Sequence, residues 1–165
     1  MTFQNRFFPA TLRARELIDE GRLGRIFHFR AAYLHSGYVD PQRAFTWRMD
    51  RSHGGGALAD LGSHLIDLMR HLLGDYAAVH ATTATFIAQR PLQGHPQTMR
   101  AVDVDDWAVM TVRMKGGFPG IIEASRFAVG VQDDLRFEIH GEKGALRFNL
   151  MEPNWLYFFD NTDPA

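Results

Sequence analysis

The spacing of hydrophobic residues predicts two helices in the first half of the chain. Residues Pro9 to Glu20 place apolar positions among charged ones, and Gly21 follows as a typical helix stop. The three glycines Gly54 to Gly56 precede a longer segment in which apolar residues recur at helical spacing as far as Gly74. The second segment has the stronger helical pattern of the two.

Alternating apolar and polar residues predict one early strand, Ile26 to Leu34, and a series of later ones. The later strands are Val79 to Ile87, Trp107 to Met114, Phe118 to Ser125, Leu135 to His140, Ala145 to Leu150 and Trp155 to Phe159. Short glycine-containing connections at Lys115 to Gly117 and Gly141 to Gly144 indicate antiparallel hairpins. The pattern therefore predicts an α+β domain: a mostly antiparallel open β-sheet with helices packed on one face.

Two segments lack periodicity, and one face of the predicted sheet lacks a cover. Tyr38 to Ser52 is expected to be a loop, and Arg90 to Asp105, with two prolines and a glycine, a mobile loop. Four large apolar residues exceed what a small helical layer is expected to cover: Trp107, Phe127, Phe137 and Phe148. We therefore expect the uncovered face to be the interface of a homo-oligomer.

Composition limits the class of protein. The chain has 165 residues, 45% of them hydrophobic, and a formal net charge of −1, which fits one globular domain. Both charge signs are interspersed, so a nucleic-acid partner is not expected, and no apolar run is long enough for a membrane span or a signal peptide. The absence of cysteine fits a reducing compartment, and a cytoplasmic location is the expectation.

Asp60 and His64 are the candidates for chemistry. A separation of four residues places them on one face of the second predicted helix, where a carboxylate can orient an imidazole for proton transfer. The preceding glycines would let a ligand approach the helix start. A structural alternative stays open, in which Asp60 is a cap-side carboxylate and His64 a hydrogen-bonded core imidazole.

Other polar residues are candidates for the same cleft. Trp47 and Arg48 precede the glycines, where an arginine can bind a substrate hydroxyl or carboxylate, and Asn5, Arg6 and Tyr33 lie near the chain start. His53 and His71, with Asp60 and His64, offer metal ligands, but at no established ligand spacing. Gly54 to Gly56 lacks the third glycine and the preceding strand of a dinucleotide-binding loop.

The segment from Gly54 to Leu68, GGGALADLGSHLIDL, resembles the signature helix of the Gfo/Idh/MocA family of glucose-fructose oxidoreductases and inositol dehydrogenases. Further agreements follow in family order and cover nearly the whole chain: Asn5-Arg6, Pro9-Ala10, Leu23 to Ile26, Trp47-Arg48, Asp105-Asp106, Ile139 to Gly141 and Lys143 to Leu146. The resemblance implies that His64 is the acid/base that takes a proton from a substrate hydroxyl, and that Asp60 positions the substrate, a sugar or polyol.

The family's N-terminal Rossmann domain, with its glycine-rich loop and catalytic lysine, has no counterpart in this sequence. The resemblance therefore implies that residues 1–165 are a single substrate-binding and dimerisation domain, truncated at both ends relative to the family. NAD or NADP would serve the parent enzyme, while this chain alone would bind neither cofactor and would not turn over.

Two other hypotheses stay open. The chain could be a stand-alone, non-catalytic binding or assembly module descended from the family. It could instead be a small metal-dependent hydrolase or isomerase that uses His53, His64 and Asp60.

Overall fold

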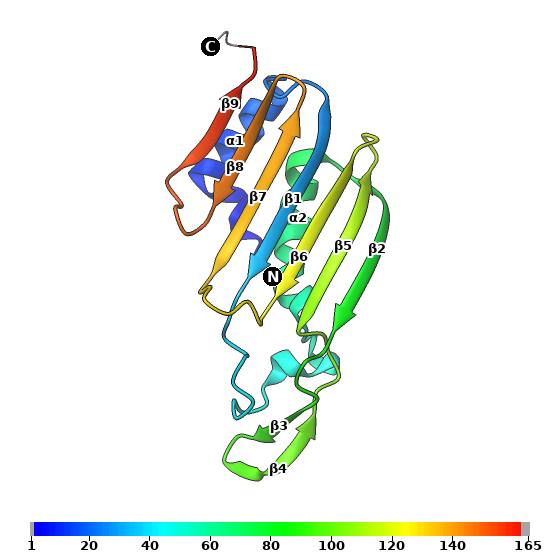
Figure 1. Ribbon diagram of the computed structural model, residues 1–165, viewed down its shortest axis with the longest axis vertical. Coiled ribbons are helices and arrows are strands. Elements are labelled where there is room, and N and C mark those ends of the chain that lie inside the picture. The colour runs from blue at the N-terminus through cyan, green and yellow to red at the C-terminus, as the bar shows by residue number, and fades with distance from the viewer. Residues whose placement is uncertain (1, 163–165) are drawn as a thin grey trace.

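A seven-stranded sheet forms the centre of the computed structural model, which describes residues 2–162. The strand order is β2-β5-β6-β1-β7-β8-β9 (Figure 1). The strands are β1 (Ile26–Leu34), β2 (Tyr76–Ala84), β5 (Trp107–Met114), β6 (Pro119–Ser125), β7 (Asp134–Gly141), β8 (Gly144–Asn149) and β9 (Leu156–Asp160). Among the strands of residues 2–162, only the pairing of β1 with β6 is parallel, which confirms the predicted mostly antiparallel α+β architecture.

Both α-helices lie behind the sheet in Figure 1, so the predicted one-sided helical layer is confirmed. Helix α1 (Pro9–Asp19) starts with a proline in its first turn, and α2 (Ser63–Leu73) ends at Gly74, whose φ of 90° favours glycine. The helical pattern after the three glycines begins with the single π-helical turn η4 (Leu58–Gly62) rather than with α-helix. A short 3-10 turn, η1 (Gln4–Phe7), precedes α1.

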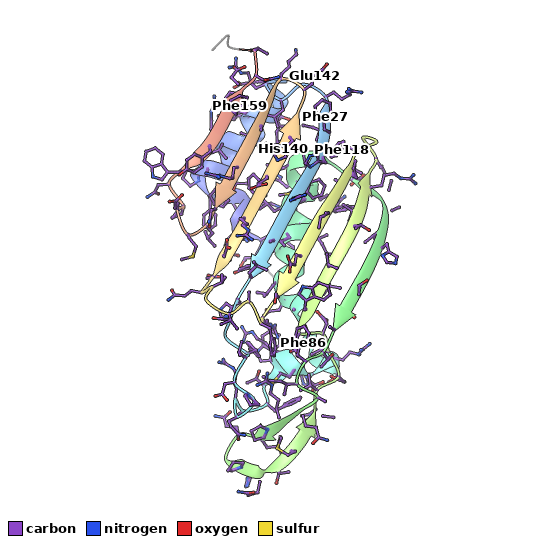
Figure 2. All side chains as sticks on the ribbon, in the orientation of Figure 1. Phe27, Phe86, Phe118, His140, Glu142 and Phe159 are labelled. Carbon is purple, nitrogen blue, oxygen red and sulfur yellow. The ribbon has the colours of Figure 1, made fainter. Side chains whose placement is uncertain are left out.

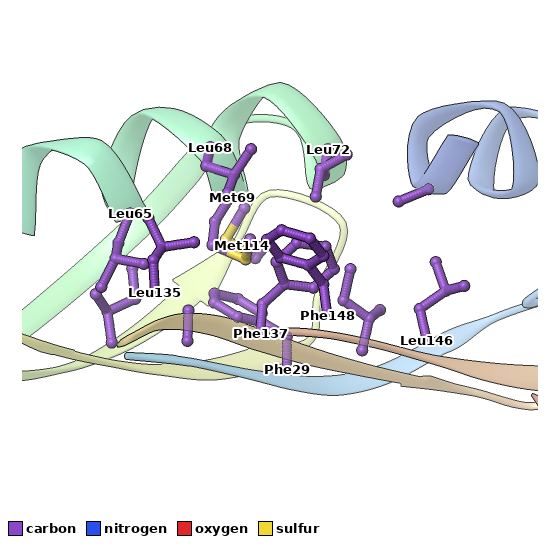
Figure 3. Packing of buried hydrophobic residues seen from close by; sticks show 14 of the residues in the cluster. Phe29, Leu65, Leu68, Met69, Leu72, Met114, Leu135, Phe137, Leu146 and Phe148 are labelled. Carbon is purple, nitrogen blue, oxygen red and sulfur yellow. The ribbon is translucent and has the colours of Figure 1, made fainter. Parts of the chain in front are cut away.

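The main core lies between the helices and the sheet, as Figure 3 shows. Leu65, Leu68 and Leu72 of α2 are buried against the strands, as are Phe137 and Phe148. The sequence argument that Phe137 and Phe148 exceed the helical cover was wrong. The register pairs them on neighbouring strands β7 and β8, so both point to the helix-covered side and neither is exposed.

The other two residues of that argument differ from each other. The alternating burial along β5 places Trp107 on the uncovered face, where its ring nitrogen donates to the Glu123 carboxylate at 2.9 Å, whereas Phe127 packs against a separate small cluster. Of the four residues, Trp107 is therefore the one that adds apolar surface to the uncovered face.

A small lobe, defined here as residues 35–57 and 85–105, projects from one end of the sheet (Figure 1). It contains a second sheet of β3 (Gln89–Leu92) and β4 (His95–Ala101), so the prediction of a mobile loop over this segment was wrong. Pro91 is tolerated because β3 pairs with β4 alone, and the Pro91 carbonyl accepts a hydrogen bond from Phe45 N at 2.7 Å. Gly94, with φ of 76°, makes the turn.

Two segments differ in their bounds from the sequence expectation. The strand expected from Val79 to Ile87 starts earlier, at Tyr76, and ends at Ala84. It ends there because the Asp106 carboxylate binds the backbone amides that follow, Phe86 N (2.7 Å) and Ile87 N (3.3 Å). The expected loop from Tyr38 to Ser52 contains the 3-10 turn η2 (Trp47–Met49) and the start of η3 (Arg51–His53). Within residues 2–162, no helix has the length and apolar character that a membrane crossing requires.

Candidate functional site

Asp105 occupies the start of the helical segment that carries the candidate residues. Its backbone carbonyl accepts a hydrogen bond from Ala57 N at 2.9 Å, and its carboxylate accepts one from Leu58 N at 2.7 Å. A Cβ at Gly56 would lie 2.5 Å from the same carboxylate. The expectation of a helix start open to a ligand was therefore wrong: the glycine is needed for the approach of Asp105, which acts as a cap.

Asp60 lies on the η4 turn and binds two arginines. Its Oδ2 accepts hydrogen bonds from Arg48 Nε at 3.1 Å and from Arg126 Nη2 at 2.5 Å. Arg126 also donates to the Arg48 carbonyl at 3.0 Å. The carboxylate therefore joins the small lobe to the end of β6 through charge-assisted hydrogen bonds.

His64, at the start of α2, is held by other residues. Its Nδ1 lies 3.5 Å from the amide nitrogen of Asn5, and its ring meets the rings of Phe3 and Tyr33 edge-on, at centroid separations of 5.8 and 6.0 Å. The imidazole is thus oriented by Asn5 and by aromatic edges. The expected orientation of His64 by Asp60 is not what the contacts show, since the guanidinium groups are stronger partners for the carboxylate.

Tyr33 connects the two groups of residues. Its ring contacts His64, and burial, a hydrogen bond to the Asp133 carboxylate and the negative charges of Asp133 and Asp60 raise the pKa of its hydroxyl. The hydroxyl therefore stays protonated at physiological pH, with Asp133 as its hydrogen-bond partner.

Arg6 and Trp47 complete the set predicted from the sequence. Arg6 makes a two-pronged ion pair with Asp67 on α2, one contact of which, from Nε, measures 2.7 Å. Trp47 is half exposed, and the Arg48 guanidinium stacks 4.4 Å from the centre of its ring. The structure therefore brings Asn5, Tyr33 and His64 together, places Trp47 and Arg48 beside Asp60, and commits the guanidinium of Arg6 to Asp67.

The residues considered as a metal set are held separately. His53 contacts Asp50 at 3.1 Å, whereas Asp60 binds arginines. The Nε2 atom of His71 is buried without a hydrogen-bond partner, and burial, with the charges of Arg6 and Arg15, lowers its pKa. In the part of the chain that the structure describes, no three His, Cys, Asp or Glu side chains form a group that could hold a metal ion. Within residues 2–162, the geometry therefore gives the hydrolase or isomerase hypothesis no metal site.

Two residues at the site carry roles that sequence reasoning missed. Asp105 was noted for its place in the family pattern, but its capping of the helical segment was not predicted. Arg126 follows β6 and looks like an ordinary charged residue at a strand end, yet it is 2% exposed. No local signal identifies it, because its partner Asp60 is 66 positions away.

Comparison with known proteins places this arrangement in a family. Residues 11–147 match the model of the GFO/IDH/MocA C-terminal domain. The chain belongs to the GFO/IDH/MocA family. This confirms the resemblance that the sequence carries around Asp60 and His64.

Relatives in this family include enzymes that act on sugars. Levoglucosan dehydrogenase from Pseudarthrobacter phenanthrenivorans is 38% identical over 177 residues, which cover all of this chain and 45% of that protein. A structure of levoglucosan dehydrogenase in complex with NADH and L-sorbose superposes with a TM-score of 0.95 at 39% identity, over 99% of this chain and 44% of that one. An NAD-binding oxidoreductase from Klebsiella pneumoniae superposes with a TM-score of 0.93 at 33% identity, over 98% and 43% of the two chains. This GFO/IDH/MocA chain spans less than half the length of these relatives.

Proposed function

We propose that this chain is the substrate-binding and oligomerisation domain of an NAD(P)-dependent oxidoreductase that acts on a sugar, a polyol or a related hydroxy compound. The observation that carries the proposal is the pairing of a positioned imidazole, His64, with an arginine-held carboxylate, Asp60, on one helical segment. Sugar dehydrogenases with similar sequences align over the whole chain, which supports the substrate class.

His64 supplies the acid/base in this proposal. Its Nδ1 lies beside Asn5, and its Nε2 has no hydrogen-bond partner within residues 2–162, so Nε2 is the atom left for a substrate hydroxyl. An asparagine amide can present either its nitrogen or its oxygen, so Asn5 can serve both tautomers of the ring. With the Asn5 oxygen turned toward Nδ1–H, Nε2 can take the proton of the hydroxyl that is oxidised.

The side chains around His64 determine how a sugar would bind. The exposed ring of Trp47 offers an apolar surface for the carbon face of a sugar, and Arg48 can donate hydrogen bonds to its oxygens. The Tyr33 hydroxyl, which is hydrogen-bonded to Asp133, can accept one from a sugar hydroxyl. Asn5 and Arg6 contribute from the chain start. Arg6 would act through its ion pair with Asp67 on α2, which fixes η1 and Asn5 against the helix.

This chain alone is proposed to bind no dinucleotide. The helix start that could receive a phosphate is filled by the Asp105 carboxylate, which would repel one. NAD(P), which accepts hydride from a hydroxyl-bearing carbon, would therefore bind to a separate nucleotide-binding half. Titration of the chain with NADH and NADPH, followed by cofactor fluorescence, is expected to show no saturable binding; tight binding would refute this part of the proposal.

The activity can be tested in a chimaera in which this chain replaces the aligned 177 residues of levoglucosan dehydrogenase. We expect sugar-dependent NADH formation that His64→Ala reduces by a factor of about 10² to 10⁴, as for loss of a general acid/base. His53→Ala, in the small lobe, is the control and should keep the wild-type rate. A folded chimaera that binds a sugar but never reduces NAD or NADP would favour the non-catalytic module instead.

The uncovered face of the sheet is the proposed interface for a second copy. Arg30, Glu138 and Arg147 lie side by side across β1, β7 and β8, and Ile121, which is 41% exposed, neighbours Arg30 on β6. A row of alternating charges flanked by an apolar residue can pair with its own copy under a two-fold rotation. Figure 2 shows that charged and aromatic side chains, His140 and Phe159 among them, populate the sheet.

A further inference from the structure

Arg126 is a buried positive charge beside the proposed site. Its side chain is 3% exposed, although it stands just beyond the end of β6. A guanidinium at this depth requires partners for its charge and its N–H groups, and its removal would leave those partners unpaired.

The contacts of Arg126 fix both its backbone and its guanidinium. The backbone amide donates to the Asp106 carbonyl at 3.0 Å, and the guanidinium lies 4.7 Å from the centre of the buried Tyr38 ring. The two terminal nitrogens bind the Arg48 carbonyl and Asp60 Oδ2. Arg126 is thus in place before any ligand arrives.

The two arginines of the site differ in exposure and in the nitrogens that they use. Arg48 is 42% exposed and reaches Asp60 through Nε, and its two terminal nitrogens have no hydrogen-bond partner in the described structure. Arg126 is buried, and both of its terminal nitrogens donate hydrogen bonds to protein atoms. One arginine can therefore contact a ligand, while the other is confined to holding the site together.

The oxygens of Asp60 are used unequally as well. Both arginines bind Oδ2, and within residues 2–162 Oδ1 has no hydrogen-bond or ion-pair partner. The Asp60 side chain is 21% exposed, so Oδ1 can be reached from outside.

We infer that Arg126 is the positioning residue of Asp60: it holds Oδ2 so that Oδ1 accepts a hydrogen bond from a substrate hydroxyl next to the one that His64 deprotonates. This inference rests on the proposed function and adds a specific acceptor atom to it. It also implies a substrate with two neighbouring hydroxyl groups, a vicinal diol, because Asp60 and His64 each take one.

The levoglucosan dehydrogenase chimaera tests this role, because a variant that misplaces Asp60 should lower kcat, whereas a variant that loses a substrate contact should raise KM. Arg126→Met should lower kcat about 10²-fold, the effect expected when a catalytic group is displaced by about 1 Å. Arg126→Lys, and added guanidinium ion with Arg126→Ala, should restore part of the rate. Arg48→Met should instead raise KM, since Arg48 is proposed to contact the substrate.

Arg90→Met is the matched control. Arg90 is as buried as Arg126, but it binds the backbone carbonyls of Tyr38 and Asp40 in the small lobe. This variant should lose stability and keep kcat within about threefold of wild type. Equal losses of kcat in Arg90→Met and Arg126→Met would show that Arg126 merely stabilises the fold, and would overturn the inference.

A measurement on this chain alone keeps the two proposals separate. A crystal structure of the Arg126→Met chain should show the Asp60 carboxylate rotated toward Arg48 or toward solvent. An unmoved carboxylate would overturn the positioning role, whether or not the chimaera is active. An inactive wild-type chimaera with a displaced Asp60 in this variant would count against the proposed function and not against the role of Arg126.

Discussion

The sheet with its two helices and the small lobe are held together by different physical interactions. The core under the helices is a continuous apolar cluster that joins α1 and α2 to the strands from β5 to β8. The small lobe buries a cluster of just three apolar residues, Tyr38, Phe45 and Met49, and surrounds it with buried charges such as Arg90 and Asp50. Phe86, which Figure 2 labels at the junction between the two regions, packs on Phe127. The centres of the two rings lie 5.1 Å apart.

This difference bears on the site, which lies where the regions meet. The helical segment on the sheet carries Asp60 and His64, whereas the lobe supplies Trp47 and Arg48. Apolar burial is insensitive to pH and tolerates few changes of volume, while buried ion pairs depend on protonation and on complete pairing. The lobe should therefore be the part of the molecule that responds to conditions and to single polar substitutions.

The largest effect is expected from a cavity in the main core. Phe137 is fully buried and packs against Phe148, with ring centres 5.4 Å apart. Phe137→Ala should lower the free energy of unfolding by about 3–5 kcal/mol, measured by urea denaturation. Phe159→Ala, at a side chain that is 65% exposed, is the control and should change it by about 0.5 kcal/mol or less.

Loss of a buried charge in the lobe should have a smaller, local effect. Arg90→Met removes the donors to the Tyr38 and Asp40 carbonyls, and an unpaired buried acceptor costs about 1–3 kcal/mol. Amide hydrogen exchange should accelerate in β3 and β4 and stay unchanged in β5 and β6. Uniform acceleration of exchange throughout both sheets would mean that the lobe is not a separate unit. The control is Arg113→Met, at an exposed position on β5, which should leave exchange in β3 and β4 unchanged.

Acid should loosen the lobe before the sheet. Hydrogen bonds from Ser52, with contributions from His53 and Arg100, lower the pKa of Asp50 from 3.8 to about 2. Because the folded pKa is the lower one, this stabilisation is complete above about pH 4 and is lost as the pH falls toward 2. Amide exchange in β3 and β4 should accelerate through this window.

Two variants separate this effect from general acid unfolding. Asp50→Asn should remove the pH dependence and loosen the lobe at neutral pH. Asp75→Asn should leave it unchanged, since Asp75 pairs with Arg70 and Lys115 on the exposed surface. If amide exchange in β3 and β4 of the Asp50→Asn protein still accelerates between pH 4 and 2, another carboxylate is responsible.

The smallest effect on stability is expected on the open face. Ile121→Glu should change the free energy of unfolding of a monomer by about 0.5 kcal/mol or less, yet weaken association by placing a charge in the proposed interface. Light scattering over a concentration series measures the association. Thr111→Glu, on the adjacent strand β5, tests how far the interface extends. If the molar mass in solution of both variants equals that of the wild type, the interface lies elsewhere.

The sequence by itself determined the elements that depend on local pattern. Helical spacing located α1 and the segment that becomes η4 and α2, and the turns at Lys115 to Gly117 and Gly141 to Gly144 join antiparallel strands as expected. The same segment carries the family pattern around Asp60 and His64, so the family was evident without coordinates. Each of these signals lies within a few neighbouring residues, which is the range over which backbone preference and periodicity act.

The tertiary structure decided what depends on distant partners. The parallel pairing of β1 with β6 and the capping of the helical segment by Asp105 each join residues far apart in the chain. The partners of the site residues belong to the same class: Arg126 binds Asp60, and Asn5 orients His64. A charged side chain has no periodic signal of its own, and its burial is favourable only where the fold brings an opposite charge to it, so these contacts became visible only in three dimensions.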